Sequence, residues 1–550
     1  MFKTINILRA CLLTTLVATS AAIADGRLEG RVIAADDTTF LEGARVSIPA
    51  LNRTVSTARD GRFTFGRVPA GSHEVTVEYL GAAAQTETVS VRDGATAQLS
   101  FVIGAELDEI VVRGQRAGTT RALNQQRMSD NVVSVIAAED IGALPDANVA
   151  EAVQRVPGVF LDRDQGEGRY IGVRGVDPNL NITTINGLYV PSPDAGARSV
   201  ALDVIPSDLL EGLEVYKTFT PDMEASAIGG TVNVRSLSAF DRDGGTFSVA
   251  AEGSYNGLVE EFSPKLSGSY TNTFGADDNF GLAFAASWFD RDFGSDNIET
   301  DGGWFDGLET VDEQVFKGAE EIEQRSYTVN RERIGLALNL DARTDNGRYY
   351  WRNLYSEFSD QEYRMRNEFK FDDGDAISGS SSSAQWEGAT IEKSMKDRLE
   401  EQTILSMLLG GENYFNQWTI DYSYGYSYGE ETEPARLDTE FELEDITIGY
   451  SSIGEIPFLT SEAGAAVADN YVIKEFVYLD GLAEDEANTF KANFTYDLFS
   501  DAYNGNIKFG ALYRTRDKDY NAEETIYELS LIHISEPTRQ LASSRMPSSA

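Results

Sequence analysis

The sequence repeatedly alternates large apolar or aromatic residues with small or polar ones, over runs of about ten residues. In WTIDYSYGYSY, residues 418–428, the even positions hold tryptophan, isoleucine and tyrosine, and the odd positions hold threonine, aspartate, serine and glycine. FKANFTYDL at 490–498 and IGLALNLDA at 334–342 repeat the pattern, and NFGLAFAASW at 279–288 alternates large residues with small ones. Because successive side chains point to opposite faces of a strand, each run predicts a β-strand with one apolar and one polar face.

The length, recurrence and aromatic content of these runs favour a transmembrane β-barrel over a soluble sandwich, which also alternates. The connections predicted between the runs are short at 275–278 and 345–347 and long and polar at 290–325 and 370–398. Short turns at one end and long loops at the other are typical of outer-membrane barrels. We therefore expect residues 245–528 to form antiparallel barrel strands with their apolar faces toward lipid.

Charge and composition restrict the partners. The chain has 89 acidic and 46 basic residues and a formal net charge of -43. Phosphate recognition needs clustered lysine and arginine, so nucleic acid is not an expected partner. The acidic balance predicts a ligand that is neutral or cationic overall.

The first 24 residues have the pattern of a secretory signal peptide. Lys3 and Arg9 precede the apolar stretch 11–24, and Ala22-Ile23-Ala24 gives a cleavage site before Asp25. The stretch is shorter than the roughly 20 residues that a spanning helix needs. Cys11 is the only cysteine, so we expect a mature chain without disulfides.

Two further units follow. Short alternating runs across 26–103, with an Asp-Gly turn in RDGRFTF, predict a small β-sandwich. Residues 115–125 are predicted to be a linker. Residues 117–238 predict a compact α/β domain: a helix capped by Asp146 and ended by Pro157, an Asn186-Gly187 hairpin, and a second short helix opening at 206–208.

No motif indicates an enzyme. His73 and His533 are the only histidines, and neither has a partner at metal-ligand spacing. Asp162 and Asp164 in DRDQGEG lack the remaining spacing of a calcium loop. We expect no catalytic residue, no metal and no cofactor.

The order of motifs resembles a known family. ARDGRFTFGRVPAGSHEVTVEYLG is similar to the carboxypeptidase regulatory-like domain. Residues 126–236, from VQRVPGVFLDRDQGEGRYIGVRGVDPN through LDVIPSDLLEGLEVYKTFTPDMEASAIGG, resemble the plug domain of TonB-dependent outer-membrane receptors, most closely the Caulobacter–Xanthomonas branch. The resemblance implies a mainly β protein with a sandwich, an α/β plug and the first part of a large antiparallel barrel. It also implies a non-enzymatic protein in contact with lipid in a Gram-negative outer membrane.

The resemblance also assigns site residues. The segment DEIVVRG resembles a TonB box, which would pair as a strand with the periplasmic domain of TonB in the TonB–ExbB–ExbD complex; the alternative is a last strand of the sandwich. The residues of the box are Asp108, Glu109, Ile110, Val111, Val112, Arg113 and Gly114. Structural plug motifs fall on Arg174, Gly175, Asn186, Gly187, Gly229 and Gly230, with Arg174 expected to make polar contacts between plug and barrel.

The implied function is energy-coupled uptake of a small molecule or oligosaccharide. The branch resemblance favours a saccharide or related compound. Trp304, Phe305 and Trp386 in the long loops could stack on sugar rings, although packing within the loops explains them equally well. A ferric siderophore or other chelate is the alternative ligand, and a passive porin or a surface-binding protein is the alternative function.

The chain departs from the family at its C-terminal end. Receptor barrels have about 22 strands, whereas 245–528 contains roughly ten to twelve candidates. Alternation stops at 529–550, LSLIHISEPTRQLASSRMPSSA, where serine, arginine and proline dominate. We interpret this segment as a non-native tail and the barrel as incomplete, because lipid cannot satisfy open strand edges.

Overall fold

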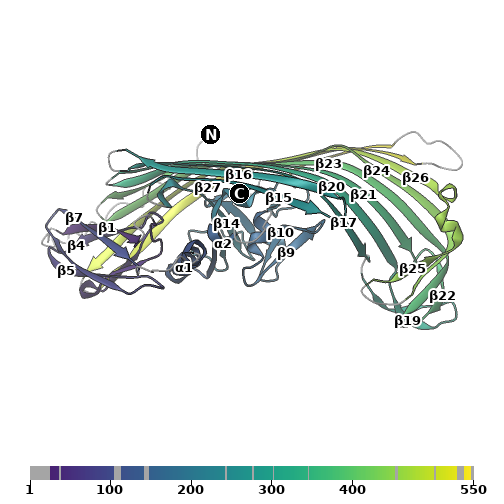
Figure 1. The fold of residues 1–550 in the computed structure, drawn as a ribbon, viewed down its shortest axis with the longest axis horizontal. Coiled ribbons are helices and arrows are strands. Elements are labelled where there is room, and N and C mark those ends of the chain that lie inside the picture. The colour runs from purple at the N-terminus through teal and green to yellow at the C-terminus, as the bar shows by residue number, and fades with distance from the viewer. Residues whose placement is uncertain are drawn as a thin grey trace, which may run out of the picture.

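The computed structural model describes residues 25–546 apart from 36–38, 105–112, 142–147, 242–243, 276–277, 301–302, 345, 416, 452–455, 501–502 and 529–537. The predicted signal peptide lies outside these residues. A long curved sheet arches over a central domain, with a small β-sandwich at one end of the sheet and the strands β19, β22 and β25 at the other (Figure 1).

The sandwich has the short alternating strands that its sequence predicts. Its two sheets have the strand orders β4-β1-β7 and β3-β2-β5-β6. Leu28, Phe63, Phe65 and Phe101 lie in the core between them. The predicted Asp-Gly turn leads into β4, with Gly61 at a φ of 70°. The strands are β1 Gly26–Ala34, β2 Arg45–Ile48, β3 Arg53–Ser56, β4 Arg62–Val68, β5 Gly71–Glu78, β6 Gln85–Val91 and β7 Thr96–Ile103, with a 3-10 turn η1 at Pro49–Leu51.

The central domain surrounds a five-stranded sheet of order β12-β11-β14-β13-β8. Asn186 and Gly187 both have positive φ, 53° and 82°, and join β11 to β12 as the predicted hairpin. The elements are α1 Arg113–Met128, β8 Val133–Ala137, α2 Ala138–Ile141, α3 Val149–Val153, β9 Val159–Asp164, β10 Glu167–Val173, η2 Pro178–Leu180, β11 Ile182–Ile185, β12 Leu188–Tyr189, η3 Ser207–Leu209, β13 Leu210–Tyr216, β14 Thr231–Ser236 and η4 Ala239–Asp241.

Two local predictions in this domain are wrong. Residues 115–125, expected to be a linker, belong to the 16-residue helix α1. The helix expected after Asp146 is only the five-residue α3, and its N-cap is Asn148, whose side chain accepts from the Glu151 amide at 3.0 Å. Asp146 itself lies outside the described residues. The four apolar residues of α3 are buried, so this helix is held by packing and not by its length.

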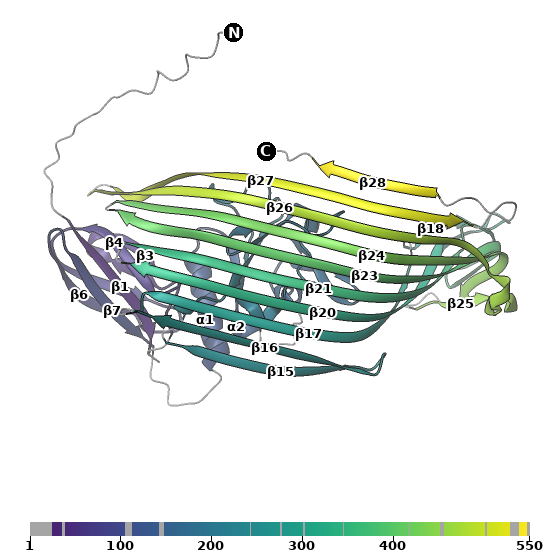
Figure 2. The same cartoon turned by 90° about the horizontal axis from the view of Figure 1, so that it is seen from above.

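The long sheet, which we call the wall sheet, is antiparallel and contains 12 strands. Ten follow one another edge to edge, and β22 and β25 pair with its loop end; Figure 2 shows the long strands running side by side. The strands are β15 Thr246–Asn256, β16 Glu261–Phe274, β17 Phe280–Glu299, β20 Glu321–Thr344, β21 Gly347–Lys370, β22 Asp375–Gly379, β23 Ser383–Phe415, β24 Trp418–Ser451, β25 Phe458–Ser461, β26 Val472–Ser500, β27 Tyr503–Glu528 and β28 Thr538–Met546. A separate hairpin, β18 Phe305–Glu309 and β19 Val315–Gly318, and the turns η5 Ala463–Ala466 and η6 Ala468–Asn470 complete the loop end.

The alternating runs place their apolar residues on the convex face, as predicted. On β20, Leu338 is 38% exposed, whereas the neighbouring Asn339, which faces the central domain, is 1% exposed. Gly425 on β24 allows that domain to approach the wall, because a Cβ there would lie 2.3 Å from Leu188 Cδ1. A band of outward apolar residues of this kind is typical of strands that cross a bilayer.

The strands are much longer than the apolar runs that predicted them. β17 continues to Glu299 and β20 begins at Glu321, so both ends of the loop expected at 290–325 belong to paired strands. The middle of that loop contains the β18–β19 hairpin. Likewise β21 reaches Lys370 and β23 begins at Ser383. On these extensions the outward residues of β20 are polar, as at Thr328 and Asn330. The wall sheet therefore extends beyond its apolar band toward the long loops.

Among the described strands, β15 pairs only with β16 and β28 only with β27, so the wall sheet is curved but open. Within the predicted tail, Thr538–Met546 forms β28. In the described part of the chain, no helix is long and apolar enough to span a membrane.

The apolar band gives the first prediction. Replacing the outward Leu338 with lysine should weaken insertion into lipid vesicles by about 2–4 kcal/mol, the cost of a basic residue near the middle of the band. Thr328→Lys, on the polar extension of the same strand, is the matched control and should insert normally. Equal insertion of the two variants, measured by protease protection in vesicles, would show that the band does not face lipid.

Candidate functional site

The concave face of the wall sheet carries charged side chains where it meets the central domain. Arg331 and Arg333 lie two residues apart on β20 and therefore point to the same face. Asp360 on β21 is paired in register with Arg331. Arg398 and Glu400 on β23 follow on the same face, since Asp360 pairs with Glu400. Strand alternation thus brings five ionisable groups together opposite the central domain.

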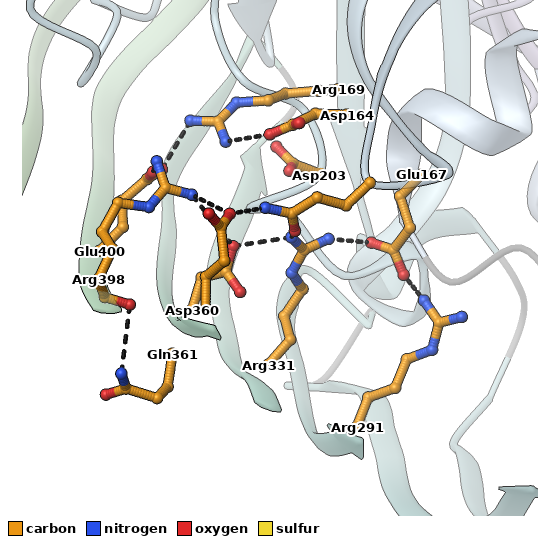
Figure 3. Close-up of polar contacts among 12 residues, drawn as sticks. Asp164, Glu167, Arg169, Asp203, Arg291, Arg331, Asp360, Gln361, Arg398 and Glu400 are labelled. Atoms are coloured by element: carbon orange, nitrogen blue, oxygen red, sulfur yellow. Dashed lines mark hydrogen bonds and ion pairs between the residues drawn. The ribbon is translucent and has the colours of Figure 1, made fainter. Parts of the chain in front are cut away.

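Glu167, the first residue of β10 in the central domain, contacts these charged side chains (Figure 3). Its Oε2 accepts from Arg331 Nη1 at 2.8 Å and from Arg333 Nη2 at 2.5 Å. Its other oxygen pairs with Arg291 on β17. Arg331 also reaches Asp360 at 2.8 Å, and Arg333 donates from Nε to the Asp203 carbonyl at 2.7 Å. One carboxylate of the central domain therefore joins three arginines of the wall.

In a second contact the charges are reversed, because an arginine of the central domain pairs with a carboxylate of the wall. Arg169 Nη2 donates to Glu400 Oε1 at 2.7 Å, and Arg398 Nη1 holds the other oxygen of Glu400 at 2.7 Å. Burial lowers the pKa of Arg169, but Glu400 and Asp203 outweigh it and raise the pKa well above its ordinary value. Arg169 therefore stays charged.

These contacts form one buried network, which we call the interface network: Glu167, Arg169, Arg291, Arg331, Arg333, Asp360, Arg398 and Glu400. Arg331, Arg333 and Asp360 are at most 1% exposed. The guanidinium of Arg331 also lies 5.1 Å from the rings of both Phe293 and Phe358. Removing one member of such a buried set leaves its partners charged and dry, at a cost of about 3–5 kcal/mol.

A polar cavity of about 440 Å³ opens beside the interface network, between β9 and β10 of the central domain and β23 and β24 of the wall sheet. Its lining has six carboxyl groups, three guanidinium groups and one tyrosine. Tyr170 Oη donates to Asp194 Oδ2 at 2.5 Å across it. The lining residues are Asp162, Arg163, Asp164, Arg169, Tyr170, Asp194, Arg398, Glu400, Glu431 and Glu433.

Glu431 lies on β24 beyond the outward aromatic run that ends at Tyr428, and so outside the apolar band. Burial raises the pKa of Glu431 to about 8, and the charges of Glu400 and Asp194 act in the same direction. Gln402 donates to it at 2.5 Å. The cavity therefore holds a carboxyl group that is largely protonated at neutral pH.

Comparison with known proteins identifies the two smaller units. The family model of the TonB-dependent receptor plug domain matches residues 125–231, and that of the carboxypeptidase regulatory-like domain matches residues 27–104. The vitamin B12 transporter BtuB of Photobacterium profundum is 28% identical over 130 residues, which are 23% of this chain and 21% of that protein. The chain therefore contains a TonB-dependent receptor plug domain and a carboxypeptidase regulatory-like domain.

Solved receptor structures resemble the chain only loosely. The unliganded ferric citrate transporter FecA shares 13% identity at a TM-score of 0.28, with 76% of this chain and 81% of that one covered. The siderophore receptor PirA of Acinetobacter baumannii shares 11% identity at 0.29, with 74% and 79% covered. The chain covers about a fifth of the length of BtuB, the curated relative that it matches. The central domain is the domain that the plug family model matches, and we call it the plug. The interface network joins the plug to the wall sheet.

The predicted plug motifs lie away from the cavity. Arg174, at a φ of 62°, donates to the carbonyls of Ile228 and Gly229 at 2.9 Å each, so it braces the plug internally and does not make the expected contact with the barrel. Gly175 follows it at a φ of 72°. A Cβ at Gly229 would lie 2.1 Å from Asn181 Oδ1, and one at Gly230 would lie 2.8 Å from Val173 Cγ1. Asn186 Nδ2 donates to Ser236 at 2.8 Å.

The three aromatic residues predicted as ligand contacts lie in the loop end and not at the plug. Trp386 is 4% exposed and stacks on Phe371 at 4.5 Å between ring centroids. Trp304 meets Tyr450 edge to face at 5.4 Å, and Phe305 begins the β18 hairpin and is half-buried. Trp386 thus has no free face for a sugar ring in this arrangement. Packing within the loop end, the alternative explanation, accounts for its position.

Most of the predicted TonB box lies outside the residues that the structure describes. Asp108, Glu109, Ile110, Val111 and Val112 lie among the undescribed residues, and Arg113 and Gly114 begin α1. His73 is half-buried, and its ring contacts the Pro69 carbonyl at 2.7 Å. His533 also lies outside the described residues.

One acidic cluster lies near the loop end. Carboxylate oxygens of Glu321, Glu323 and Glu368 come within 4.8 Å of one another. Arg366 pairs with Glu323 at 3.1 Å and with Glu368 at 2.8 Å, and Lys370 pairs with Glu368 at 3.4 Å. Since cations of the chain already balance these charges, we assign no metal site to them.

The interface network gives the second prediction. Glu167→Gln keeps the shape of the side chain but removes the charge that three arginines share. It should lower the free energy needed to release the plug from the wall by about 3–5 kcal/mol. Asp306→Asn, which affects the exposed Lys317 pair, is the control and should change it by less than about 1 kcal/mol. Urea-induced exposure of the plug to protease in detergent measures both, and equal midpoints would contradict the assignment.

The third prediction concerns pH. The pKa of Glu431 rises from its ordinary 4.5 to about 8 on folding, so between these values the folded state binds more protons than the unfolded one. Stability should therefore fall as pH rises from about 4.5 to 8 and level off above. Glu431→Gln should flatten this decline in thermal melts taken from pH 5 to 9, whereas the exposed Glu309→Gln should leave it unchanged. A Glu431→Gln curve parallel to that of the wild type would refute the buried acid.

Proposed function

We propose that this receptor sits in the outer membrane of a Gram-negative bacterium and imports a small polar solute in a step energised through TonB. The observation that carries the proposal is the buried interface network between plug and wall. Arg331, Arg333 and Glu167 are almost completely buried, so the plug cannot leave its seat without separating charges in a dry environment. Such a seat suits a transporter in which external work displaces the plug, and it disfavours a passive porin.

The work would enter through residues 108–114, of which Arg113 and Gly114 are the first two residues of α1. The segment DEIVVRG offers three β-formers between charged and glycine residues, which suits pairing with a strand of TonB. Backbone groups would supply most of the affinity, and alternate side chains would select the partner. The TonB–ExbB–ExbD complex is the partner that the family assignment implies.

The composition of the cavity supports our choice of ligand class. Its carboxylates outnumber its guanidinium groups, and both kinds of group, with the Tyr170 hydroxyl, can hydrogen-bond a polyhydroxylated solute. We therefore favour a saccharide or another neutral or cationic polar compound over a polyanion. The curated relative is named a vitamin B12 transporter, so a chelate such as a ferric siderophore is the alternative. The relatives named above are transporters and receptors, and we assign no enzymatic reaction to the chain.

The fourth prediction tests energy coupling. Val111→Pro removes a backbone donor from the pairing strand and should reduce uptake to background while leaving membrane insertion and ligand binding intact. Val111→Thr retains a β-branched residue and should transport normally.

Uptake of a panel of neutral oligosaccharides and of one ferric siderophore is measured in cells that express each variant. Loss of uptake in the proline variant only, for one member of the panel, is the expected outcome and also decides the ligand class. Transport by Val111→Pro at the wild-type rate would remove the TonB box from the account.

A further inference from the structure

One turn of the sandwich contacts both the plug and the wall. Arg59 and Asp60 precede Gly61 in the turn that enters β4. Arg59 Nη2 donates to the carbonyl of Ser236, the last residue of plug strand β14, at 2.8 Å, and to Asp241 Oδ2 at 2.6 Å. Asp60 Oδ2 pairs with Arg343 Nη1 of β20 at 3.4 Å. Neighbouring residues of one turn thus bridge the two bodies that the interface network also joins.

These contacts are largely buried from solvent. The side chain of Arg59 is 12% exposed and that of Asp241 is 7% exposed. Asp241 ends η4, between the last plug strand and the first strand of the wall. Its Oδ2 also accepts from the Ser238 amide at 2.9 Å, so the arginine completes an existing local structure. A charge-assisted contact of this kind is stronger than an ordinary exposed pair.

A second face of the sandwich holds helix α1 and the plug. Glu42 Oε2 accepts from Gln125 Nε2 at 2.6 Å and from Arg235 Nη2 of β14 at 3.0 Å. Asn124, 1% exposed, accepts from the Leu80 amide at 3.0 Å. On its other side α1 is tied to the plug by Arg121, which pairs with Glu211 at 2.9 Å. The helix therefore lies between the sandwich and the plug.

The backbones of the sandwich and α1 approach closely at one glycine. Gly43 has a φ of 76°, and a Cβ there would lie 2.9 Å from Asn124 C and from Gln125 N. These are backbone atoms that cannot rotate away. The sandwich can dock against α1 in this way only because residue 43 has no side chain.

We infer that the N-terminal sandwich is a second lock on the plug, which ties α1 and β14 to the strand ends of the wall and must undock before the plug can move. Figures 1 and 2 show the sandwich at the end of the wall sheet where short turns connect the strands. Arg27 adds to the docking there, with Nη1 3.4 Å from Asn346 Oδ1 and its guanidinium 5.5 Å from the Tyr414 ring.

The lock also bears on force transmission. Residues 105–112 connect β7 of the sandwich to α1 of the plug. A pull on the predicted TonB box would act on β7 and α1 together. The sandwich that contains β7 is held to α1 by the contacts of Glu42 with Gln125 and of Leu80 with Asn124. The docking itself does not depend on the proposed transport, so it can be tested without an uptake assay.

The test is a distance measurement on the full chain in detergent. Cys11 is the only native cysteine, so in a Cys11→Ser background spin labels can be placed at Ser90→Cys on the sandwich and Thr344→Cys on the wall. The docked sandwich should give a single narrow distance distribution. A broad distribution in this unaltered pair would overturn the inference at once.

Gly43→Ala should broaden that distribution and raise the hydrogen-exchange rate of the β14 amides by about tenfold or more, because one hold on the plug is lost. Gly94→Ala is the matched control: Gly94 also has a positive φ, 66°, but a Cβ there meets nothing within 4 Å. The control should behave as the wild type. If the two variants give the same distances and exchange rates, Gly43 does not mediate docking.

Arg59→Glu provides a second variant that adds no Cβ clash. It places a negative charge against Asp241 and should release the sandwich, whereas Arg92→Glu, at an exposed position of the same sandwich, should not. Melting of the sandwich core is followed in parallel, so an unfolded sandwich is distinguished from an undocked one. Narrow distances and unchanged β14 exchange in Arg59→Glu, with the sandwich folded, would contradict the lock.

Discussion

The contact of Glu167 with Arg331 and Arg333 determines much of the rest of the structure. Both arginines are buried on the concave face of the wall. Glu167 of the plug pairs with both, and Asp360 of the wall pairs with Arg331 alone. A wall with charges on this face cannot be filled by apolar side chains, so it needs a polar plug. The same strand alternation that turns Arg331 and Arg333 inward turns Ile334, Leu336 and Leu338 outward. One sequence pattern therefore specifies the lipid face and the plug seat together.

The wall strands serve two environments along their length. Their apolar outward residues cluster near the short turns, and the same strands continue with polar outward faces to the loop end. There Phe371, Trp386 and Tyr450 form a small core of their own, which closes the long connections over the sheet. The acidic cavity is lined by residues of plug strands β9 and β10 and of wall strands β23 and β24.

The sequence predicted the parts that follow from periodicity and missed those that depend on distant partners. Alternation placed the strands and their faces, and Asn186-Gly187 placed a hairpin. Helix α1 was missed because RGQRAGTTRALNQQRM has no apolar stripe; it is held by Arg121, Asn124 and Gln125 through polar contacts on two sides. The strand extensions were missed because the apolar alternation of the shorter runs does not continue into them. Arg331 and Arg333 lie just before the alternating run 334–342 and were not predicted as site residues; Glu167 is 164 residues from Arg331, and no local signal joins them.

The central claim is that the plug is held to the wall by charge pairing in a buried interface. A double-mutant cycle on Arg169 and Glu400 tests it most directly, since this pair joins one residue of the plug to one of the wall at 2.7 Å. Arg169→Met, Glu400→Gln and the double variant are compared by the free energy of plug release in urea. The account predicts a coupling energy of at least about 1.5 kcal/mol, in the range measured for close buried charge pairs. Additive effects of the two substitutions would show that the pair does not hold the plug.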